Sequence, residues 1–172
     1  MKMSGTKIIA ADRDTVWAAL LNPDVLRASV PGCTEMDGTA DTGFTATVVQ
    51  KVGPVKATFK GAVAVEDRVA PASLRLSGEG KGGAAGFAKG GADVTLTEGP
   101  EGTELHYNVE AKVGGKLAQL GSRIIDGFAK KMADQFFERF KDVVEEPQEE
   151  AETSADEPEA PKKGWFKSLV SG

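Results

Sequence analysis

Residues 116–146 have the sequence KLAQLGSRIIDGFAKKMADQFFERFKDVVEE, which contains the clearest periodicity in the chain. Its apolar residues recur in steps of three or four, as they do along one face of an α-helix. No proline interrupts the pattern, and a continuous helix of this length would be roughly 45 Å long. Such a helix must lay its apolar face against a sheet or another helix, and the residues of that face are Leu117, Leu120, Ile124, Phe128, Met132, Phe136, Phe140 and Val143.

The preceding sequence predicts a sheet that can accept this helix. Apolar and polar residues alternate strictly over residues 55–65 and again over 105–113. Alternation with a period of two is typical of antiparallel strands that have one face covered and one face in water. Shorter runs of the same kind, separated by turns rich in glycine and proline, bring the expected number of strands in this region to about six.

The N-terminal segment adds one more strand and two short helices. Residues 3–10 are expected to form the strand, and Asp12 is a suitable N-cap for a first helix. A second helix is expected to begin at Pro23 and to end before the turn at residues 31–32. The order of elements predicts an α+β fold in which a curved antiparallel sheet of about seven strands wraps around the long C-terminal helix.

Several positions on the inward face of the predicted sheet are occupied by small residues. Small side chains that face a helix leave space between sheet and helix, whereas a solid core needs larger ones. The alternative is that the helix packs closer to the sheet at these positions, and the sequence leaves both interpretations open. The small residues are Ala46, Ala57, Gly61, Gly78, Ala92 and Ala111.

Composition and charge limit the class of protein. A chain of 172 residues can form one domain with an appendage. Residues 1–144 contain 18 acidic and 18 basic side chains, so no basic face of the kind that binds nucleic acid is expected. The single cysteine, Cys33, excludes an intrachain disulfide and agrees with a reducing compartment. No segment approaches the roughly 20 apolar residues of a membrane-spanning helix. We therefore expect a cytoplasmic protein whose membrane attachment, if any, is peripheral.

Two motifs carry a resemblance to a known family. Residues 16–33 read VWAALLNPDVLRASVPGC, and residues 78–88 read GEGKGGAAGFA. Over residues 3–144 the chain resembles the CoxG family of carbon monoxide dehydrogenase subunits, which is part of the START/Bet v 1-like (SRPBCC) helix-grip superfamily. The resemblance implies a hydrophobic cavity between sheet and helix. It also implies association with molybdenum hydroxylases such as CO dehydrogenase and with the inner face of the membrane.

The predicted cavity would be lined by apolar side chains. Such a lining suits a long hydrophobic ligand, and an isoprenoid quinone such as menaquinone, or a lipid, fits this description. Tyr107 is the one inward residue with a polar tip, and its hydroxyl could orient a ligand carbonyl. The alternative is that these residues form an ordinary core. They are Leu26, Val30, Phe44, Val48, Phe59, Leu76, Phe87, Val94, Tyr107, Leu120, Ile124 and Phe128.

No set of residues with the pattern of an active site is found. His106 is the only histidine and falls on the polar side of its strand, so we expect a surface residue. Cys33 is expected to be a small apolar filler. The glycine-rich run 78–91 lacks the GxxxxGK[ST] pattern of a phosphate-binding loop. We therefore expect neither catalytic residues nor a metal site.

The C-terminal residues differ from the domain at 1–146. Residues 147–160 are rich in Glu, Pro, Ala, Ser and Thr and are expected to form an acidic disordered linker. Residues 161–172 combine lysines with an apolar face, which is typical of a weak interfacial membrane anchor. Docking into a groove on a partner protein is the alternative. The anchor residues would be Lys162, Lys163, Trp165, Phe166, Lys167, Leu169 and Val170.

Three functional hypotheses follow. The first is a non-enzymatic carrier that binds a hydrophobic ligand and supports electron transfer or membrane recruitment for a molybdenum hydroxylase. The second is an adaptor or maturation factor for the same class of enzyme, with a filled core and no ligand. The third is a cyclase or hydrolase, which the absence of an inward polar constellation disfavours.

Overall fold

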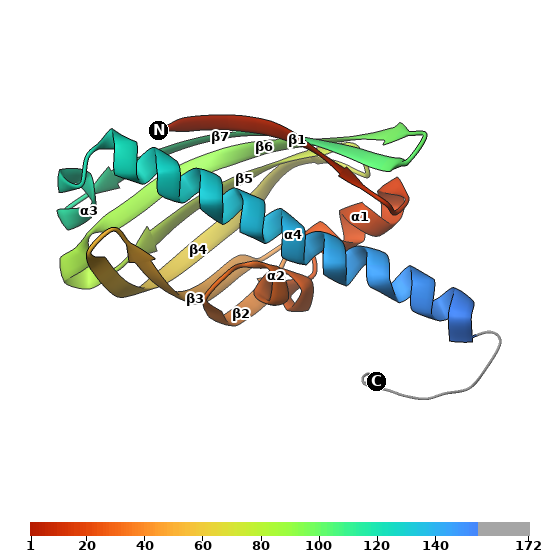
Figure 1. The fold of residues 1–172 in the computed structure, drawn as a ribbon, viewed down its shortest axis with the longest axis horizontal. Helices are drawn as coiled ribbons and strands as arrows, with labels where there is room; N and C mark the ends of the chain where they lie inside the picture. The colour runs from red at the N-terminus through yellow and green to blue at the C-terminus, as the bar shows by residue number, and fades with distance from the viewer. Residues whose placement is uncertain (155–172) are drawn as a thin grey trace.

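The computed structural model describes the backbone of residues 1–154 and the side chains of residues 1–145. In this part of the chain, seven antiparallel strands form one curved sheet with the order β1-β7-β6-β5-β4-β3-β2, and helix α4 (Ser122–Ser154) crosses one face of it (Figure 1). The predicted α+β architecture is confirmed. The strands are β1 (Lys2–Ile9), β2 (Cys33–Thr39), β3 (Gly43–Val52), β4 (Val55–Val69), β5 (Ser73–Lys81), β6 (Phe87–Gly99) and β7 (Gly102–Gly114).

The two short helices after β1 begin where the sequence predicts. Asp12 caps α1 (Arg13–Leu20), and its Oδ1 accepts a hydrogen bond of 2.7 Å from the backbone N–H of Thr15. Hydrogen bonding from the side chain of Thr15, and then from its backbone N–H, holds the pKa of Asp12 below its usual value. Asn22 caps α2 (Pro23–Ser29), in which Pro23 occupies the first position.

The alternation of side chains along the strands is also confirmed. On β4 the apolar positions from Val55 to Val65 are half-buried, and the intervening lysines are exposed. On β7, Leu105 and Tyr107 are buried and face α4, whereas Asn108 and Glu110 face solvent. The inward face of the sheet is therefore the one that the sequence identifies.

The predicted continuous helix over 116–146 is interrupted near its start. A short helix, α3 (Lys116–Gln119), ends at Leu120, and α4 begins after Gly121. Gly121 has φ +90°, a left-handed conformation that glycine adopts without the steric cost of a Cβ atom. At the other end α4 continues to Ser154, so its backbone extends into the segment for which a linker is predicted. Residues of good helix propensity, mainly Glu, Gln and Ala, dominate this extension.

The face of α4 that is buried is shifted by about one residue from the predicted one. Three pairs of adjacent apolar residues lie along the helix, and in each pair the second residue is the more buried one. Ile124 is 41 % exposed, whereas Ile125 is 9 % exposed. The prediction that Ile124 faces the interior is therefore wrong. The more buried members are Ile125, Phe137 and Val144.

Candidate functional site

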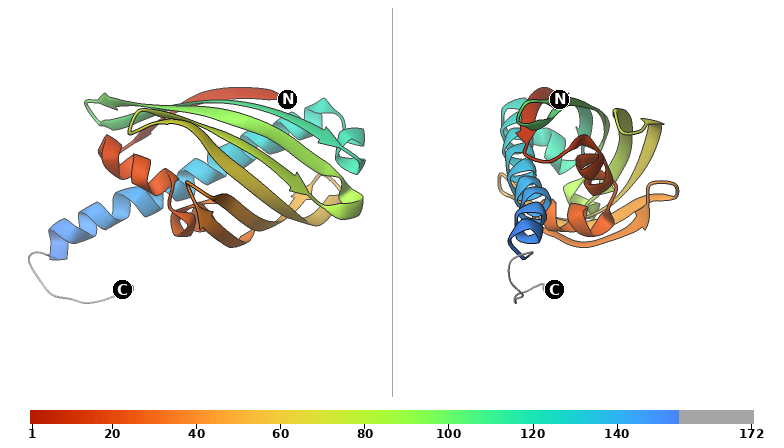
Figure 2. Two further views of the ribbon diagram at one scale, coloured as in Figure 1. Left: turned by 180° about the vertical axis from the view of Figure 1, so that it is seen from behind. Right: turned by 90° about the vertical axis from the view of Figure 1, so that its right-hand side faces the viewer.

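The candidate site lies between α4 and the inward face of the sheet. Among the strands, α4 approaches β1 and β3 most closely, and these lie at or near opposite edges of the sheet. The end-on view in Figure 2 shows the strands curving away from α4 between these edges. The helix therefore spans the sheet instead of packing closely against its central strands.

The hydrophobic core is divided into two clusters, one toward each end of this interface. The larger cluster surrounds Phe140 and lies where α1 and α2 meet α4 and the sheet. The smaller cluster surrounds Leu117 and Ile125 and lies near the start of α4. The buried members of the larger cluster are Ile9, Ala11, Val16, Ala19, Leu74, Val94, Leu96, Leu105, Tyr107, Phe137, Phe140 and Val144.

The inward positions between the two clusters are occupied by small residues. Neither cluster includes them, and each remains half-buried, as do the larger neighbours Val48, Val63 and Met132. A close-packed interior would bury side chains at such positions almost completely. The structure therefore favours the interpretation in which sheet and helix are not packed together along their whole length. The small residues of this middle band are Ala46, Gly61, Gly78, Gly90, Ala92 and Ala111.

Most of the predicted lining residues face this interface. Val94 and Tyr107 lie within the larger cluster, and Leu76 packs against it. Phe59, Leu120 and Phe128 pack against the smaller cluster. Phe44 is buried, and Leu26, Val30 and Val48 are half-buried. The predicted lining is thus distributed over both ends of the middle band, and its role in binding remains a prediction.

Phe87 does not face the interface, which corrects its predicted placement. It is 43 % exposed and lies on the convex face, where its ring covers Gly114. A Cβ atom on Gly114 would come within 2.2 Å of that ring. Counting back in twos from the inward Val94 leads to Ala88, so the alternation itself places Phe87 on the opposite side.

Tyr107 points inward, and its environment is mostly apolar. The side chain is 8 % exposed, and its ring lies 5.2 Å from that of Phe137. The hydroxyl lies against Gly5, where an added Cβ atom would approach it to 2.5 Å. Gly5 is thus a supporting residue that sequence reasoning missed, because its role depends on a strand paired across a distance of about a hundred residues.

A second group missed by the sequence attaches α4 to the edge strand β1. Lys7 points inward from β1, and its Nζ lies 3.2 Å from Oδ1 of Asp134 and 6.0 Å from the ring centroid of Phe137. Lys130 also pairs with Asp134 at 3.2 Å. Hydrogen bonds from Lys7 and Lys130 lower the pKa of Asp134, so this attachment persists to a lower pH than an ordinary aspartate would allow.

His106 lies on the solvent side of β7, as predicted. Its Nδ1 lies 3.0 Å from Oγ1 of Thr6, and its Nε2 lies 2.9 Å from Oε1 of Glu104. Within the residues whose side chains are described, no group of three or more His, Cys, Asp or Glu is placed to hold a metal ion.

Cys33 is expected to react slowly with iodoacetamide at neutral pH. Partial burial raises the pKa of its thiol, and the thiol donates a hydrogen bond of 3.1 Å to the backbone oxygen of Glu35. Because only the thiolate is an effective nucleophile, alkylation should be several-fold slower in the native protein than in protein unfolded in urea. Equal alkylation rates in the native and the unfolded protein, measured by mass spectrometry, would contradict the view that Cys33 is an unreactive packing residue.

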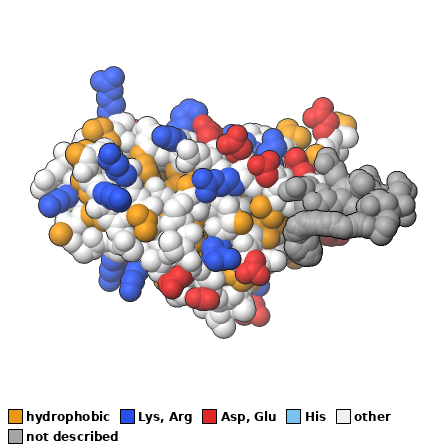
Figure 3. All heavy atoms as spheres, turned by 60° about the horizontal axis from the view of Figure 1, so that its bottom comes forward, with side chains coloured by type: hydrophobic (Ala, Val, Ile, Leu, Met, Phe, Trp, Pro, Cys, Tyr) orange, Lys and Arg blue, Asp and Glu red, His pale blue; other side chains and the backbone are white. Residues whose placement is uncertain are grey.

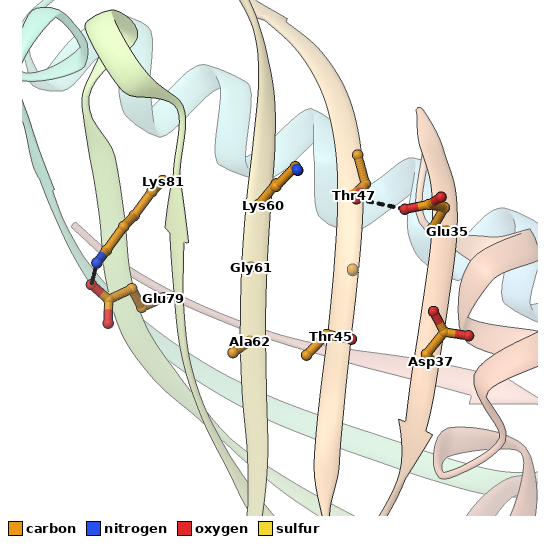
Figure 4. Close-up of a pocket in the computed structure, with 10 residues that line it drawn as sticks. Glu35, Asp37, Thr45, Thr47, Lys60, Gly61, Ala62, Glu79 and Lys81 are labelled. Atoms are coloured by element: carbon orange, nitrogen blue, oxygen red, sulfur yellow. Dashed lines mark hydrogen bonds and ion pairs between the residues drawn. The ribbon is translucent and has the colours of Figure 1, made fainter.

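The convex face of the sheet carries two polar depressions that differ in kind from the predicted cavity. One, of about 400 Å³, crosses β2 to β5, and Figure 4 shows Thr47 turned toward Glu35 and Lys81 toward Glu79. The other, of about 380 Å³, is crossed by Arg75, which pairs with Asp93 at 3.0 Å and with Glu110 at 3.2 Å. These bonds raise the pKa of Arg75, Asp93 contributing most. Open, ion-paired depressions of this kind do not suit a hydrophobic ligand.

The predicted membrane-anchoring residues of segment 161–172 lie outside the described part of the chain. Among the helices that the structure describes, none combines the length and the hydropathy needed to span a bilayer.

Comparisons with known proteins agree with this geometry. A profile of the CoxG family of carbon monoxide dehydrogenase subunits matches residues 5–145. A solved structure of a conserved protein from Geobacillus kaustophilus is 26 % identical, with a TM-score of 0.79, over 85 % of this chain and 96 % of that chain. A START superfamily protein from Mycobacterium smegmatis is 14 % identical, with a TM-score of 0.63, over 84 % of this chain and 97 % of that chain. A search of curated proteins finds no match. The likeness to the START protein shows a shared helix-grip fold, and the chain itself belongs to the CoxG family.

Proposed function

We propose that this protein binds a hydrophobic molecule, an isoprenoid quinone such as menaquinone or a lipid, between α4 and the sheet. The observation that carries the proposal is the divided core, in which a band of small, half-buried residues separates two apolar clusters. The flexible isoprenoid chain of a quinone, or the acyl chain of a lipid, could fill such a band. Apolar chains of this kind need no polar groups in the protein to bind them. Tyr107, near one end of the band, is the residue proposed to meet a ligand carbonyl.

The proposed role of this binding is to support electron transfer by a molybdenum hydroxylase such as CO dehydrogenase. The family description names a subunit of that enzyme, and a quinone is a chemically suitable acceptor for its electrons. The C-terminal segment 161–172 is proposed to hold the protein at the cytoplasmic face of the membrane, where the quinone pool lies. Binding through this short segment alone would be weak and reversible.

Extraction of the native ligand tests the proposal. The full chain is purified from its own host without detergent, extracted with organic solvent and analysed by mass spectrometry. We expect an isoprenoid quinone or a lipid in an amount comparable to that of the protein. Repeated absence of any such molecule, with intact protein in native mass spectrometry, would remove the carrier function.

An adaptor or maturation factor without a ligand is the second candidate. It is favoured by the projection of α4 beyond the sheet, which Figure 1 shows and which offers a backbone element for contact with a partner. Co-purification with the dehydrogenase discriminates the two candidates. If the protein forms a stable complex with the dehydrogenase and carries no ligand, the adaptor function is favoured.

A further inference from the structure

One end of the sheet has lysines placed directly opposite one another on neighbouring strands. Each pair lies on the convex face, and all six side chains are exposed. Like charges in directly opposed positions destabilise a sheet, so these pairs contribute nothing favourable to folding. The pairs are Lys51 with Lys56, Lys60 with Lys81, and Lys89 with Lys112.

The same end contains no acidic residue in the three segments that form most of it. Residues 49–60, 80–92 and 111–125 together contain eight Lys and Arg side chains and no Asp or Glu. Glu79, which directly precedes the second segment, lies opposite Lys89 and pairs with Lys81 at 3.8 Å. The antiparallel register brings these segments together, because they include the β3–β4 turn, the β5–β6 connection and the region from the end of β7 to the start of α4. The acidic and basic side chains of the domain, although equal in number, are therefore distributed very unequally along it. The eight residues, called the basic end, are Lys51, Lys56, Lys60, Lys81, Lys89, Lys112, Lys116 and Arg123.

Large hydrophobic side chains are exposed at the basic end. Val49, Phe87 and Ile124 are 37 %, 43 % and 41 % exposed, respectively. Ile124 lies beside the β3–β4 turn, where a Cβ atom on Gly53 would be 3.5 Å from it. Figure 3 shows hydrophobic and basic side chains interspersed at the left end of the molecule, with acidic side chains farther to the right.

The opposite end of the sheet is acidic. It is formed by the N-terminus of α1 and by the turns between β2 and β3, β4 and β5, and β6 and β7. Most charged residues in these segments are Asp and Glu, among them Asp12, Asp14, Asp41, Asp67, Glu98 and Glu101. The domain is thus electrically polarised along its length.

We propose that the basic end docks on a membrane that contains anionic phospholipid, with the acidic end directed away from it. Lysines attract acidic headgroups, and exposed apolar side chains among them can enter the interface. A nucleic acid would use the lysines but would gain little from Ile124 and Val49. This inference deepens the proposed membrane role and rests on it, because it names the surface of the domain that faces the lipid.

Vesicle binding by the full chain tests the proposal. The double variant Lys51→Glu/Lys89→Glu replaces one lysine in each of two opposed pairs. Each of these two pairs then consists of one glutamate and one lysine. We expect its binding to phosphatidylcholine vesicles that contain phosphatidylglycerol to fall at least about ten-fold, because two favourable charges become repulsive. Its thermal midpoint should change little: each substitution removes one like-charge contact, whereas Lys89→Glu also replaces the favourable contact with Glu79 on β5 by a like-charge one. The matched control Arg27→Glu/Arg139→Glu makes the same change in net charge outside the basic end and should bind nearly as the wild type does.

Three results would overturn the proposal. Wild-type affinity of the Lys51→Glu/Lys89→Glu variant would mean that the C-terminal segment alone binds the vesicles. An equal loss of vesicle affinity in both double variants would mean that vesicle binding depends only on the net charge of the protein. A loss of binding to a short DNA duplex or to an acidic partner protein, with vesicle binding intact, would assign the basic end to that partner. Organic extraction of the Lys51→Glu/Lys89→Glu variant measures its ligand content separately. A normal ligand content would show that any change in vesicle binding is independent of the proposed ligand binding.

Discussion

The Phe140→Ala protein is expected to unfold with a free energy about 3–5 kcal/mol below that of the wild type. Phe140 is fully buried, and its ring stacks on that of Phe136 at 5.7 Å and meets the edge of Phe137 at 6.4 Å. Removing the ring leaves a cavity where α4 packs on the sheet, and neighbouring aromatic rings cannot easily collapse into it. Since small domains are stable by about 5–15 kcal/mol, urea unfolding followed by circular dichroism should show a large shift of the midpoint.

Ile124→Ala is the matched control, because it truncates an apolar residue of the same helix. Ile124 is 41 % exposed, so its truncation should cost less than about 1 kcal/mol. If Ile124→Ala were as destabilising as Phe140→Ala, α4 would present the face that the sequence pattern suggests and not the one seen in the structure.

The limits of the sequence pattern are clear from this helix. Adjacent apolar residues such as Ile124 and Ile125 are compatible with two orientations that differ by about one residue in phase. Periodicity identifies the helix but cannot choose between these orientations, because the choice depends on how the helix docks on β1 and α2. Gly121 is visible in the sequence, yet only its left-handed backbone shows that it separates α3 from α4.

The strands were easier to predict than the contents of the interface. Strict alternation identifies both faces of β4 and β7, since a period of two leaves no ambiguity once one buried residue is known. The same alternation identifies most of the small inward residues, although Gly90 is not among those predicted. That they form one band between two core clusters depends on the register of five strands, which no local pattern specifies.

The unequal distribution of charge was not predictable from composition. Lys60 and Lys81 are separated by a turn and most of two strands in the sequence, and only the pairing of β4 with β5 places them opposite each other. An average over the domain hides such an arrangement, because the acids concentrate in turns at the other end. Charge counts therefore exclude a basic face only when the topology is known.

Filling the middle band is expected to abolish most ligand binding while preserving the fold. Ala46 and Ala111 face the band, and each stands opposite a glycine, Gly61 and Gly90 respectively. Because these glycines have no side chains, leucine at positions 46 and 111 has space to extend into the band. We expect Ala46→Leu/Ala111→Leu to reduce the amount of co-purified quinone or lipid at least about ten-fold, with a change in unfolding free energy within about 1 kcal/mol.

The control Ala64→Leu adds the same group on the exposed side of β4 and should leave ligand content unchanged. The stability of the double variant is the decisive second measurement, because it reports directly on whether the band is already filled. A solid core has no space for isobutyl groups in place of two methyl groups, and overpacking would then cost about 1–3 kcal/mol at each site. Strong destabilisation of Ala46→Leu/Ala111→Leu, together with a wild-type protein that yields no ligand, would mean that sheet and helix are closely packed and that the interface binds nothing.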